Sequence, residues 1–308
     1  MDIIDEYRKT EGVNFSTLKQ YLKTPAHYKF AIEHADDDEE EKKAFIIGRA
    51  MHCLILEPQH FQSRYAFIDL SKRPVPESTF RKKVNKEWRD NLIASFKEEG
   101  KLVLSMDDME MVQTMVQGIL NNKAATALLK GCIKEQIIEW TDPDTGVKCK
   151  ALVDFHDPER AQVIHGDAKS MVDVSPRAVS NFMAKYMTHM QLAFYGDGLS
   201  TVYGKHFDCP FIIASEKSQP YLCQPYFVDL KAIEAGRVMY KSLLNLHKKC
   251  KATGKWGGYD SINENLHGVI VVDLPPWAYF VAEGSKVLQE DFEGDDIPIS
   301  KIIEDSKS

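Results

Sequence analysis

Residues 151–157 (Ala-Leu-Val-Asp-Phe-His-Asp) and 164–169 (Ile-His-Gly-Asp-Ala-Lys) form the stretch that decides the fold. Each segment is an apolar run that carries an acid, and a proline-containing turn sequence separates the two, so they predict a β-hairpin. Asp154 then lies near the turn on the first strand. On the second strand Asp167 and Lys169 are two residues apart, so both side chains point to the same face.

Two carboxylates beside a fixed ammonium are what metal-assisted phosphodiester cleavage requires. Asp154 and Asp167 would hold a hard divalent cation, and Lys169 would sit beside the water that attacks the phosphate. Taken alone, an Asp-Ala-Lys sequence is more often the exposed end of a strand. The hypothesis therefore depends on what else the fold brings to the hairpin.

The composition is that of an ordinary globular protein. The chain has 308 residues, of which 44% are hydrophobic and 28% charged. No apolar run approaches the about 18 residues of a membrane span, and the first residues lack the pattern of a signal peptide. Six scattered cysteines without a Cys-x-x-Cys pair argue against a zinc or iron–sulfur site and against a disulfide framework. We expect a cytoplasmic protein without a membrane partner.

The net charge of −7 is unexpected for a protein that binds DNA phosphates. Two basic clusters offset it in part. The first comprises Lys72, Arg73, Arg81, Lys82, Lys83, Lys86 and Arg89, and the second comprises Lys248, Lys249, Lys251 and Lys255. The acids concentrate at residues 36–41, expected to be an exposed loop or the start of a helix, and at 290–305. Each basic cluster alone is equally well explained as a solvated helix face.

Apolar periodicity predicts a mainly helical first part of the chain. We expect helices over 1–35, with Ser16 as an N-cap, and over 45–56, 82–92 and 107–129. A meander of strands follows at 133–140, 147–155 and 162–169, then a single long helix over 177–203, strands at 208–216 and 222–230, and a helix over 231–251. Residues 269–272 are strand-like.

These elements predict an α/β fold. Its central sheet is mixed and mostly an antiparallel meander, it is flanked by helices, and an N-terminal helical region precedes it. We expect a single domain over 1–285, with a helical part at 1–130 and a catalytic core at 131–260. Residues 286–308 are expected to form an acidic, flexible tail.

Four further side chains can reach the hairpin in such a fold. Glu135 lies on the first strand of the meander. Gln191 and Tyr195 are four residues apart and share one helical face, where an amide and a phenol could position a lysine or a phosphate. His52 lies in an apolar helix, four residues after Gly48, whose missing side chain would let a backbone or ligand approach. From the residues alone, a core histidine is slightly favoured over a metal ligand there.

The order of these residues resembles the RecB-type nucleases of the PD-(D/E)xK superfamily, and most of all the RecE-type exonucleases (exodeoxyribonuclease VIII). The resemblance rests on Gly48-x-x-x-His52, Glu135, Asp154, Asp167-Ala168-Lys169 and Gln191-x-x-x-Tyr195. Segments 48–58, 142–154 and 189–198 are also similar to that group. Some RecB-type relatives carry an iron–sulfur cluster on four cysteines, whereas RecE-type nucleases do not, so the scattered cysteines here fit the narrower group.

The resemblance implies a role for each matching residue. The metal ligands would be His52, Asp154, Asp167 and the Ala168 carbonyl; the catalytic set would be Asp154, Asp167, Lys169, Glu135, Gln191 and Tyr195; and DNA would contact Ser16, Arg49, Arg73, Arg81, Lys82 and Lys83. The cofactor would be Mg²⁺, for which Mn²⁺ would substitute, with no iron–sulfur cluster. His52 thereby becomes an expected metal ligand.

The resemblance also implies an activity and partners. The expected activity is metal-dependent 5′→3′ exonuclease digestion of linear double-stranded DNA, leaving 3′ single-stranded overhangs for recombination. The expected setting is a bacterial cell, with the gene carried by a phage or prophage. Expected partners are duplex ends, further copies of the chain in a ring such as a tetramer, and a RecT-type single-strand annealing protein. Two alternatives stay open: a single-strand or structure-specific endonuclease, and a non-catalytic DNA-binding relative.

Overall fold

The structure, a computed structural model, describes residues 3–34, 43–75, 83–261, 270 and 272–274. Residues 1–258 form one compact unit and residues 259–308 a second. The first unit contains the sheet, the long helices and every predicted site residue that the structure describes. The predicted domain boundary at 285 stays a prediction.

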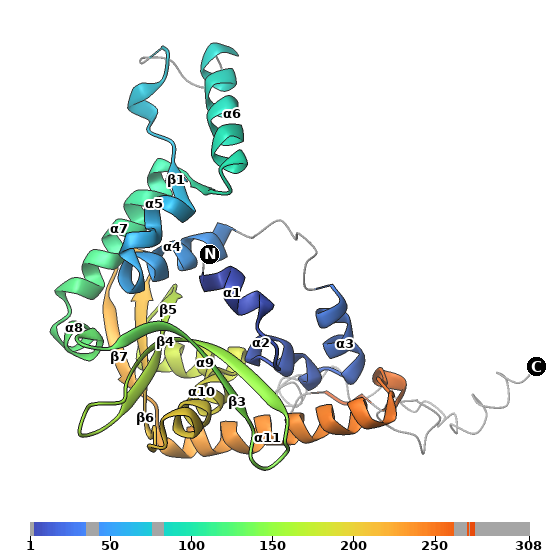
Figure 1. The fold of residues 1–308 in the computed structure, drawn as a ribbon. Coiled ribbons are helices and arrows are strands. Elements are labelled where there is room, and N and C mark those ends of the chain that lie inside the picture. The colour runs from blue at the N-terminus through green and yellow to red at the C-terminus, as the bar shows by residue number, and fades with distance from the viewer. Residues whose placement is uncertain (1–2, 35–42, 76–82, 262–269, 271, 275–308) are drawn as a thin grey trace, which may run out of the picture. The chain divides into compact units, whose positions relative to one another are not determined.

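The elements alternate as expected for an α/β protein (Figure 1). The helices are α1 Ile3–Lys9, α2 Phe15–Leu18, η1 Lys19–Leu22, α3 Pro25–Glu33, α4 Lys43–Leu56, η2 Pro58–His60, α5 Phe61–Arg64, η3 Leu70–Lys72, α6 Lys83–Glu98, α7 Met106–Asn121, α8 Lys123–Leu129, α9 Pro176–Tyr186, α10 Thr188–Tyr203, α11 Leu230–Thr253 and η4 Tyr259–Ser261. The strands are β1 Tyr65–Phe67, β2 Leu102–Leu104, β3 Ile133–Thr141, β4 Lys148–Asp157, β5 Ile164–Met171, β6 Cys209–Glu216 and β7 Cys223–Phe227.

The central sheet has five strands in the order β3-β4-β5-β6-β7. The β3–β4, β4–β5 and β6–β7 pairs are antiparallel, and only β5–β6 is parallel. Helices α9 and α10 make the crossover that a parallel pair requires. The predicted mixed, mostly antiparallel sheet is therefore confirmed. The short parallel pair β1–β2 was not expected from the sequence.

Two apolar cores cover the two faces of this sheet. Ile212 and Ala214 of β6 pack in a core with α10 and α11, whereas Ile213 between them packs in a second core with α4 and α7. This alternation is the period-2 geometry of a strand buried on both sides. In Figure 1, α10 and α11 accordingly lie on one side of the strands, and α4 and α7 on the other.

The N-terminal region predicted as helix over 1–35, with an interruption at Thr24-Pro25, is interrupted there and also earlier. It divides into α1, α2, η1 and α3, and Ser16 lies inside α2, whose N-cap is Asn14: the Asn14 side chain accepts the Thr17 N–H at 2.9 Å. The extended residue Val13 exchanges backbone hydrogen bonds with β4, donating to Lys148 and accepting from Lys150. A residue that pairs with a strand cannot be helical, so tertiary pairing decides the break.

Two predicted long helices are each divided by a cap. The helix expected over 177–203 breaks at Met187, which takes a left-handed conformation (φ 59°) between α9 and α10. The helix expected over 107–129 breaks at Asn122, whose side chain accepts the Ala124 and Ala125 N–H groups and donates to the Cys223 carbonyl on β7. Both breaks change the direction of the helix axis but leave the spacing of apolar residues in the sequence intact. The apolar periodicity could therefore not predict where the helices end.

Several predicted features lie outside the described residues. They are the acidic run at 36–41, residues 269 and 271 of the strand-like segment 269–272, the tail at 286–308, and Arg81 and Lys82. Among the described helices, none is both long and apolar enough to span a membrane.

Two buried histidines on the hairpin are held in their neutral form. Burial lowers the pKa of His156 to about 4 and that of His165 to about 4. His165 Nε2 lies 3.0 Å from the Leu192 carbonyl, and His156 Nε2 lies 3.1 Å from the Tyr203 hydroxyl, which itself donates to Gln136. Both networks fit imidazoles protonated on Nε2 alone, and both attach the hairpin to α10.

These histidines predict a loss of stability in mild acid. The unfolded chain takes up protons on them near pH 6.5, whereas the folded chain resists protonation down to about pH 4, so stability falls as the pH drops through this window. Urea unfolding at pH 7 and pH 5 should show that His156→Gln and His165→Gln each reduce the pH-dependent loss by about 2 kcal/mol. An unchanged difference between the two pH values in both variants would contradict the assignment.

Candidate metal-binding active site

The site lies where strands β4 and β5 separate. Their pairing ends at Phe155 and Gly166, so Asp154 and Asp167 are the first residues beyond the ladder. The Asp154 carboxylate replaces the missing strand contact, because its Oδ2 accepts the Ala168 backbone N–H at 2.7 Å. Both acids are thus held at the opening, with Asp154 8% and Asp167 1% exposed.

Strand β4 changes the face it presents at this point. Ala151 and Val153 pack in the core with α10, but Phe155, two residues on, packs in the core with α4. The Phe155 ring fills the space over Gly166, where an added Cβ would lie 2.2 Å from Cζ. Gly166 therefore allows the turn of the strand that leaves Asp154 at the opening.

Glu135 faces the same opening from β3. Its neighbours Lys134 and Gln136 pair with β4, whereas Glu135 itself has a left-handed backbone (φ 48°) opposite Asp154. A non-glycine residue in this region costs about 1–2 kcal/mol, and such strain is retained where surrounding structure imposes it. The strained backbone turns the Glu135 carboxylate toward His52, with Oε1 3.6 Å from Nδ1.

His52 reaches the carboxylates from α4. Its Nε2 lies 2.5 Å from the Ala168 carbonyl and 3.3 Å from Asp154 Oδ2. The approach of α4 to β5 depends on Gly48, where a Cβ would lie 3.0 Å from Ser170 Oγ. The close contact foreseen for Gly48 is therefore with a strand, and His52 belongs to the acidic cluster, contrary to the interpretation as a core residue that the residues alone slightly favoured.

The pKa values show a site with excess negative charge. Burial alone would lower the pKa of His52, but Asp154 and Glu135 raise it to about 10, which favours the protonated imidazole as long as no metal is bound. Burial raises the pKa of Asp154 to about 7, and the neighbouring Asp167 and Glu135 act in the same direction. A proton on His52 thus supplies part of the positive charge that the carboxylates require.

Asp167 is held from two sides. Lys169 Nζ lies 2.8 Å from Asp167 Oδ1 and 2.7 Å from Oδ2, and Gln191 Nε2 donates to Oδ1 at 3.1 Å. Burial would lower the pKa of Lys169, but Asp167 and Asp154 raise it above its ordinary value, so the charged form of this side chain is favoured. The predicted same-face arrangement of Asp167 and Lys169 is confirmed, and Gln191 supports the acid of this pair.

Tyr195 lies one turn after Gln191 on α10, and the two side chains interact. Burial raises the pKa of the Tyr195 phenol well above its usual value, and the nearby Tyr7 adds to the shift. Tyr7 comes from α1, which Lys150 holds in place by donating to the Tyr7 and Thr10 carbonyls at 2.7 and 2.6 Å. The first helix therefore covers this side of the site, which the sequence did not indicate.

Lys19 is a second residue that sequence reasoning missed. Burial lowers the pKa of this η1 ammonium, and Lys169 and Lys23 lower it further, so it lies within electrostatic reach of the site lysine. Its Nζ lies 5.6 Å from the Phe15 ring centre. In the described residues it has no carboxylate within 4.0 Å. The one sequence signal for Lys19 was its position three residues after Ser16, which the resemblance had assigned to DNA contact.

The donor set fits a divalent cation. One ligand atom each from His52, Glu135 and Asp154 lies within 4.8 Å of the others. Asp167 Oδ2 is buried, and Lys169 Nζ lies 2.7 Å from it. Carboxylate and carbonyl oxygens suit Mg²⁺ and Mn²⁺, and the imidazole suits Mn²⁺ better. Because His52 must lose its proton to act as a ligand, metal binding would release protons.

The residues predicted to contact DNA are more dispersed. Ser16 is exposed on α2, Arg49 is exposed on α4 and interacts with the Tyr65 phenol, and Arg73 is half-buried after η3. Lys83 begins α6 and lies 3.6 Å from Glu87. Contact of these residues with DNA stays a prediction.

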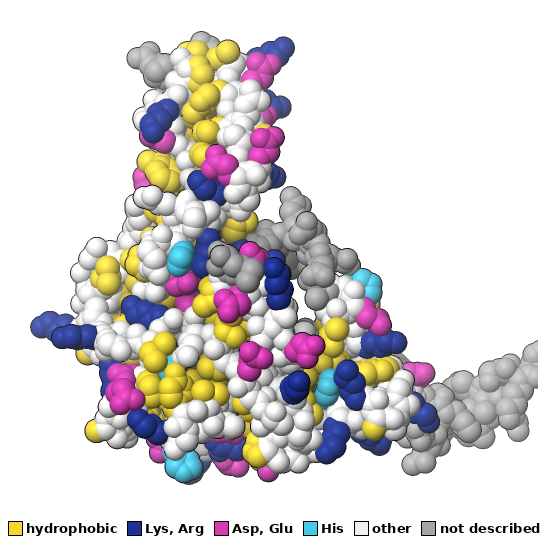
Figure 2. Space-filling view, in the orientation of Figure 1, with side chains coloured by type: hydrophobic (Ala, Val, Ile, Leu, Met, Phe, Trp, Pro, Cys, Tyr) yellow, Lys and Arg dark blue, Asp and Glu magenta, His cyan; other side chains and the backbone are white. Residues whose placement is uncertain are grey.

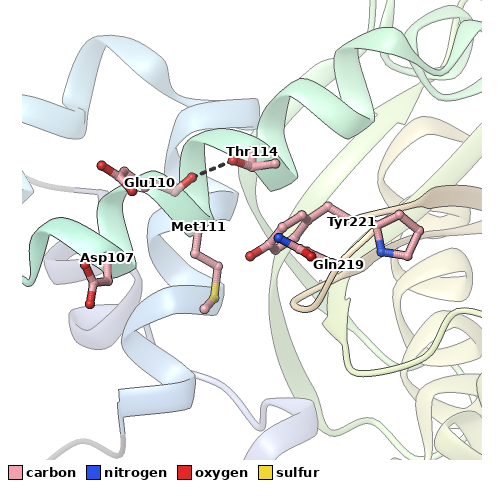
Figure 3. A pocket seen from close by; sticks show the side chains of 7 residues that line it. Asp107, Glu110, Met111, Thr114, Gln219 and Tyr221 are labelled. Carbon is pink, nitrogen blue, oxygen red and sulfur yellow. Dashed lines mark hydrogen bonds between the residues drawn. The ribbon is translucent and has the colours of Figure 1, made fainter.

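A pocket of about 640 Å³ between α7 and the β6–β7 turn does not belong to this site (Figure 3). Asp107 and Glu110 extend from α7, with Tyr221 opposite, and Thr114 donates to the Glu110 carbonyl at 2.8 Å. Among the described residues, its walls carry two carboxylates and no basic side chain. Such a lining repels phosphate, so we assign the pocket no part in phosphodiester chemistry.

Comparison with known proteins agrees with this geometry. A family model described as "PDDEXK-like domain of unknown function (DUF3799)" matches residues 14–264. The crystal structure of a "Putative exonuclease" from Eubacterium rectale is 13% identical, with 92% of this chain and 99% of that chain covered and a TM-score of 0.58; this likeness shows the fold alone. The structure of SSO0001 is 15% identical over 74% of this chain and 85% of that one, with a TM-score of only 0.25. No curated protein matches. The family match and the fold support a PD-(D/E)xK nuclease.

The left-handed backbone at Glu135 predicts that glycine is more stabilising than alanine at this position, the reverse of the usual order within a strand. Glycine within a strand is normally about 0.5–1 kcal/mol less stabilising than alanine. At this left-handed position the Glu135→Gly variant should instead be more stable than the Glu135→Ala variant, with a free energy of unfolding about 1 kcal/mol higher in urea. Both variants lose the same carboxylate, so calorimetry should show equally weakened Mn²⁺ binding. A more stable alanine variant would show that residue 135 is not strained.

Proposed function

The chain belongs to the family of PDDEXK-like domains described as DUF3799, and on this premise we propose that it is a metal-dependent exonuclease acting 5′→3′ on linear double-stranded DNA. The products would be 3′ single-stranded overhangs that enter recombination by strand annealing. The fold and the acidic site support phosphodiester hydrolysis, whereas the polarity and the duplex preference rest on the sequence resemblance to RecE-type exonucleases.

One observation carries the hydrolytic part of the proposal. Asp154, Asp167 and Glu135 converge at the opening between β4 and β5, with the Lys169 ammonium 2.7 Å from Asp167. Folding brings like charges together only where something compensates them, because repulsion between buried carboxylates destabilises the folded state. A divalent cation and a phosphate are the ligands that this arrangement fits.

His52, Asp154, Asp167 and the Ala168 carbonyl would hold Mg²⁺, with Glu135 assisting. The cation, when bound, supplies positive charge that stabilises the attacking and leaving oxygens of an in-line displacement. Asp154 accepts the Ala168 N–H and so fixes the position of the adjoining carbonyl. Lys169 retains its proton beside Asp167 and orients the attacking water or the phosphate as a cation.

Other side chains would position this set. Gln191 holds Asp167 Oδ1, and Tyr195 interacts with Gln191, so α10 fixes the acid that Lys169 also binds. Lys19 adds a second ammonium near Lys169 and would attract a phosphate of the bound strand. Ser16, Arg49, Arg73 and Lys83 would contact the DNA backbone further away.

End-labelled DNA tests the proposal. With Mg²⁺, linear duplex carrying a 5′ label should release the label as mononucleotide at once, whereas a 3′ label should stay on long fragments until late. Covalently closed circular duplex should resist digestion. Cleavage of the circle would indicate an endonuclease, and early release of the 3′ label would reverse the polarity.

Two variants serve as inactive controls in the same assay. Asp167→Ala removes a metal ligand and Lys169→Ala removes the orienting cation, so each should lower the rate by about a thousandfold or more. DNA binding in EDTA should persist, and thermal unfolding should confirm that both variants are folded. Full activity in either purified variant would exclude this site as the nuclease centre. Folded wild-type protein that binds no metal and cleaves no DNA would favour a non-catalytic relative.

Assembly is a separate proposal, supported only by the resemblance. The chain would form a ring-shaped homo-oligomer, such as a tetramer, and act with a single-strand annealing protein of RecT type. A ring would also pool the basic clusters of a chain with a net charge of −7. Size-exclusion chromatography with light scattering should give a multiple of the 35.1 kDa chain mass. A monomer at assay concentrations would count against the ring.

A further inference from the structure

A groove of about 790 Å³ lies away from the acidic cluster, within the first compact unit. Its walls are α3, residues 11–13, the β3–β4 turn and the C-terminal part of α11. A groove of this size accommodates a ligand of small-molecule width.

The charged rim of the groove is mainly basic. Lys148, Lys248 and Lys251 line it, all three are exposed, and none has a carboxylate within 4.0 Å among the described residues. Of the lining residues that the structure describes, Glu11 alone is acidic. Burial lowers the pKa of His247, so this side chain adds no charge at neutral pH. Figure 2 shows Lys and Arg side chains gathered over α3 and this end of α11.

The floor is apolar and rigid. Val13 and Val147 line it beside Tyr28, whose ring stacks on Tyr21 at 4.1 Å and on Trp256 at 5.8 Å between centroids. Tyr21 is fixed in turn by its hydroxyl, 3.1 Å from His247 Nδ1. A basic rim beside apolar side chains fits a single nucleic-acid strand, because the phosphates meet the cations while the bases lie against Ile32 and Val147, two lining apolar residues that are not buried.

The groove and the acidic site share two elements. Lys148 lines the groove and Asp154 lies at the site, six residues apart on β4, which corresponds to about 20 Å of extended strand. That distance spans roughly six nucleotides at the B-form rise of 3.4 Å, and fewer in an extended strand. The segment that supplies Val13 and α3 also places Lys19 near Lys169.

From these observations we propose that the groove between α3, the β3–β4 turn and α11 binds one DNA strand a few nucleotides away from the phosphate that is cleaved. The inference rests on the proposed function, because it takes DNA as the ligand. It adds the path of one DNA strand along the protein surface. Lys148, Lys248 and Lys251 bind its phosphates.

The test measures binding in EDTA, so that cleavage plays no part. The probe is a fluorescein-labelled oligothymidylate of about twelve nucleotides, followed by anisotropy over a range of salt concentrations. The variant Lys148→Ala/Lys248→Ala/Lys251→Ala should bind at least about tenfold more weakly. Its salt slope should fall by roughly two, because each phosphate that a lysine no longer neutralises lowers the slope by about 0.7.

A charge-matched control separates the groove from general electrostatics. The variant Lys123→Ala/Lys185→Ala/Lys231→Ala removes three exposed lysines that do not line the groove and belong to neither basic cluster. It should bind the probe like the wild type. Equal affinities in the two triple variants, whether both weak or both unchanged, would overturn the proposal. Displacement of the probe at lower concentration by polyglutamate than by unlabelled oligothymidylate of the same length would also overturn it, in favour of an acidic peptide.

Failure of the groove and failure of the nuclease are distinguishable. A chain that binds the probe through these lysines but cleaves no DNA with Mg²⁺ would retain the groove and lose the proposed activity. An active nuclease whose groove variant binds and digests DNA like the wild type would retain the activity and lose the groove.

Discussion

The structure around the site depends on one hydrogen bond, from the Ala168 N–H to the Asp154 carboxylate. Antiparallel strands normally satisfy each other's backbone groups, and β4 and β5 do so only as far as Phe155 and Gly166. Beyond that pair a side chain takes over the role of a neighbouring strand. The opening that results gives Asp167, His52 and Glu135 room to approach. At the other end of β4, Val13 pairs with the same edge that β5 occupies. This edge of β4 is therefore paired at both ends and open between them, whereas the opposite edge pairs with β3.

The electrostatic balance of the opening explains why its polar groups are arranged as they are. Buried carboxylates at close range are tolerated only with nearby positive charge or bound protons. Lys169 supplies one fixed charge, and the proton on His52 supplies another. Lys169 lies against Asp167, whereas His52 lies against Asp154 and Glu135. Under the proposed function a metal ion would replace the His52 proton, and the Lys169 ammonium would remain.

Much of this was predictable from the sequence, and the limits have physical causes. The hairpin, the Asp167–Lys169 face and the Gln191 helix follow from local periodicity, which sequence records directly. The position of His52 in the cluster is a tertiary fact, and only the family resemblance indicated it. Lys19 was missed because its neighbour Lys169 lies 150 residues along the chain. The left-handed backbone at Glu135 was also invisible, since glutamate has no preference for it.

The contacts of Ala168 have a consequence for how the Asp-Ala-Lys segment should be understood. Its N–H binds Asp154 and its carbonyl faces His52, so residue 168 serves the site entirely through its backbone. Its methyl group points the other way and is buried in the core with α4 and α7. Position 168 therefore constrains the size of the side chain and not its functional group. Another small apolar side chain that fits the core could replace Ala168, whereas Asp167 and Lys169 take part in the site through their charged groups.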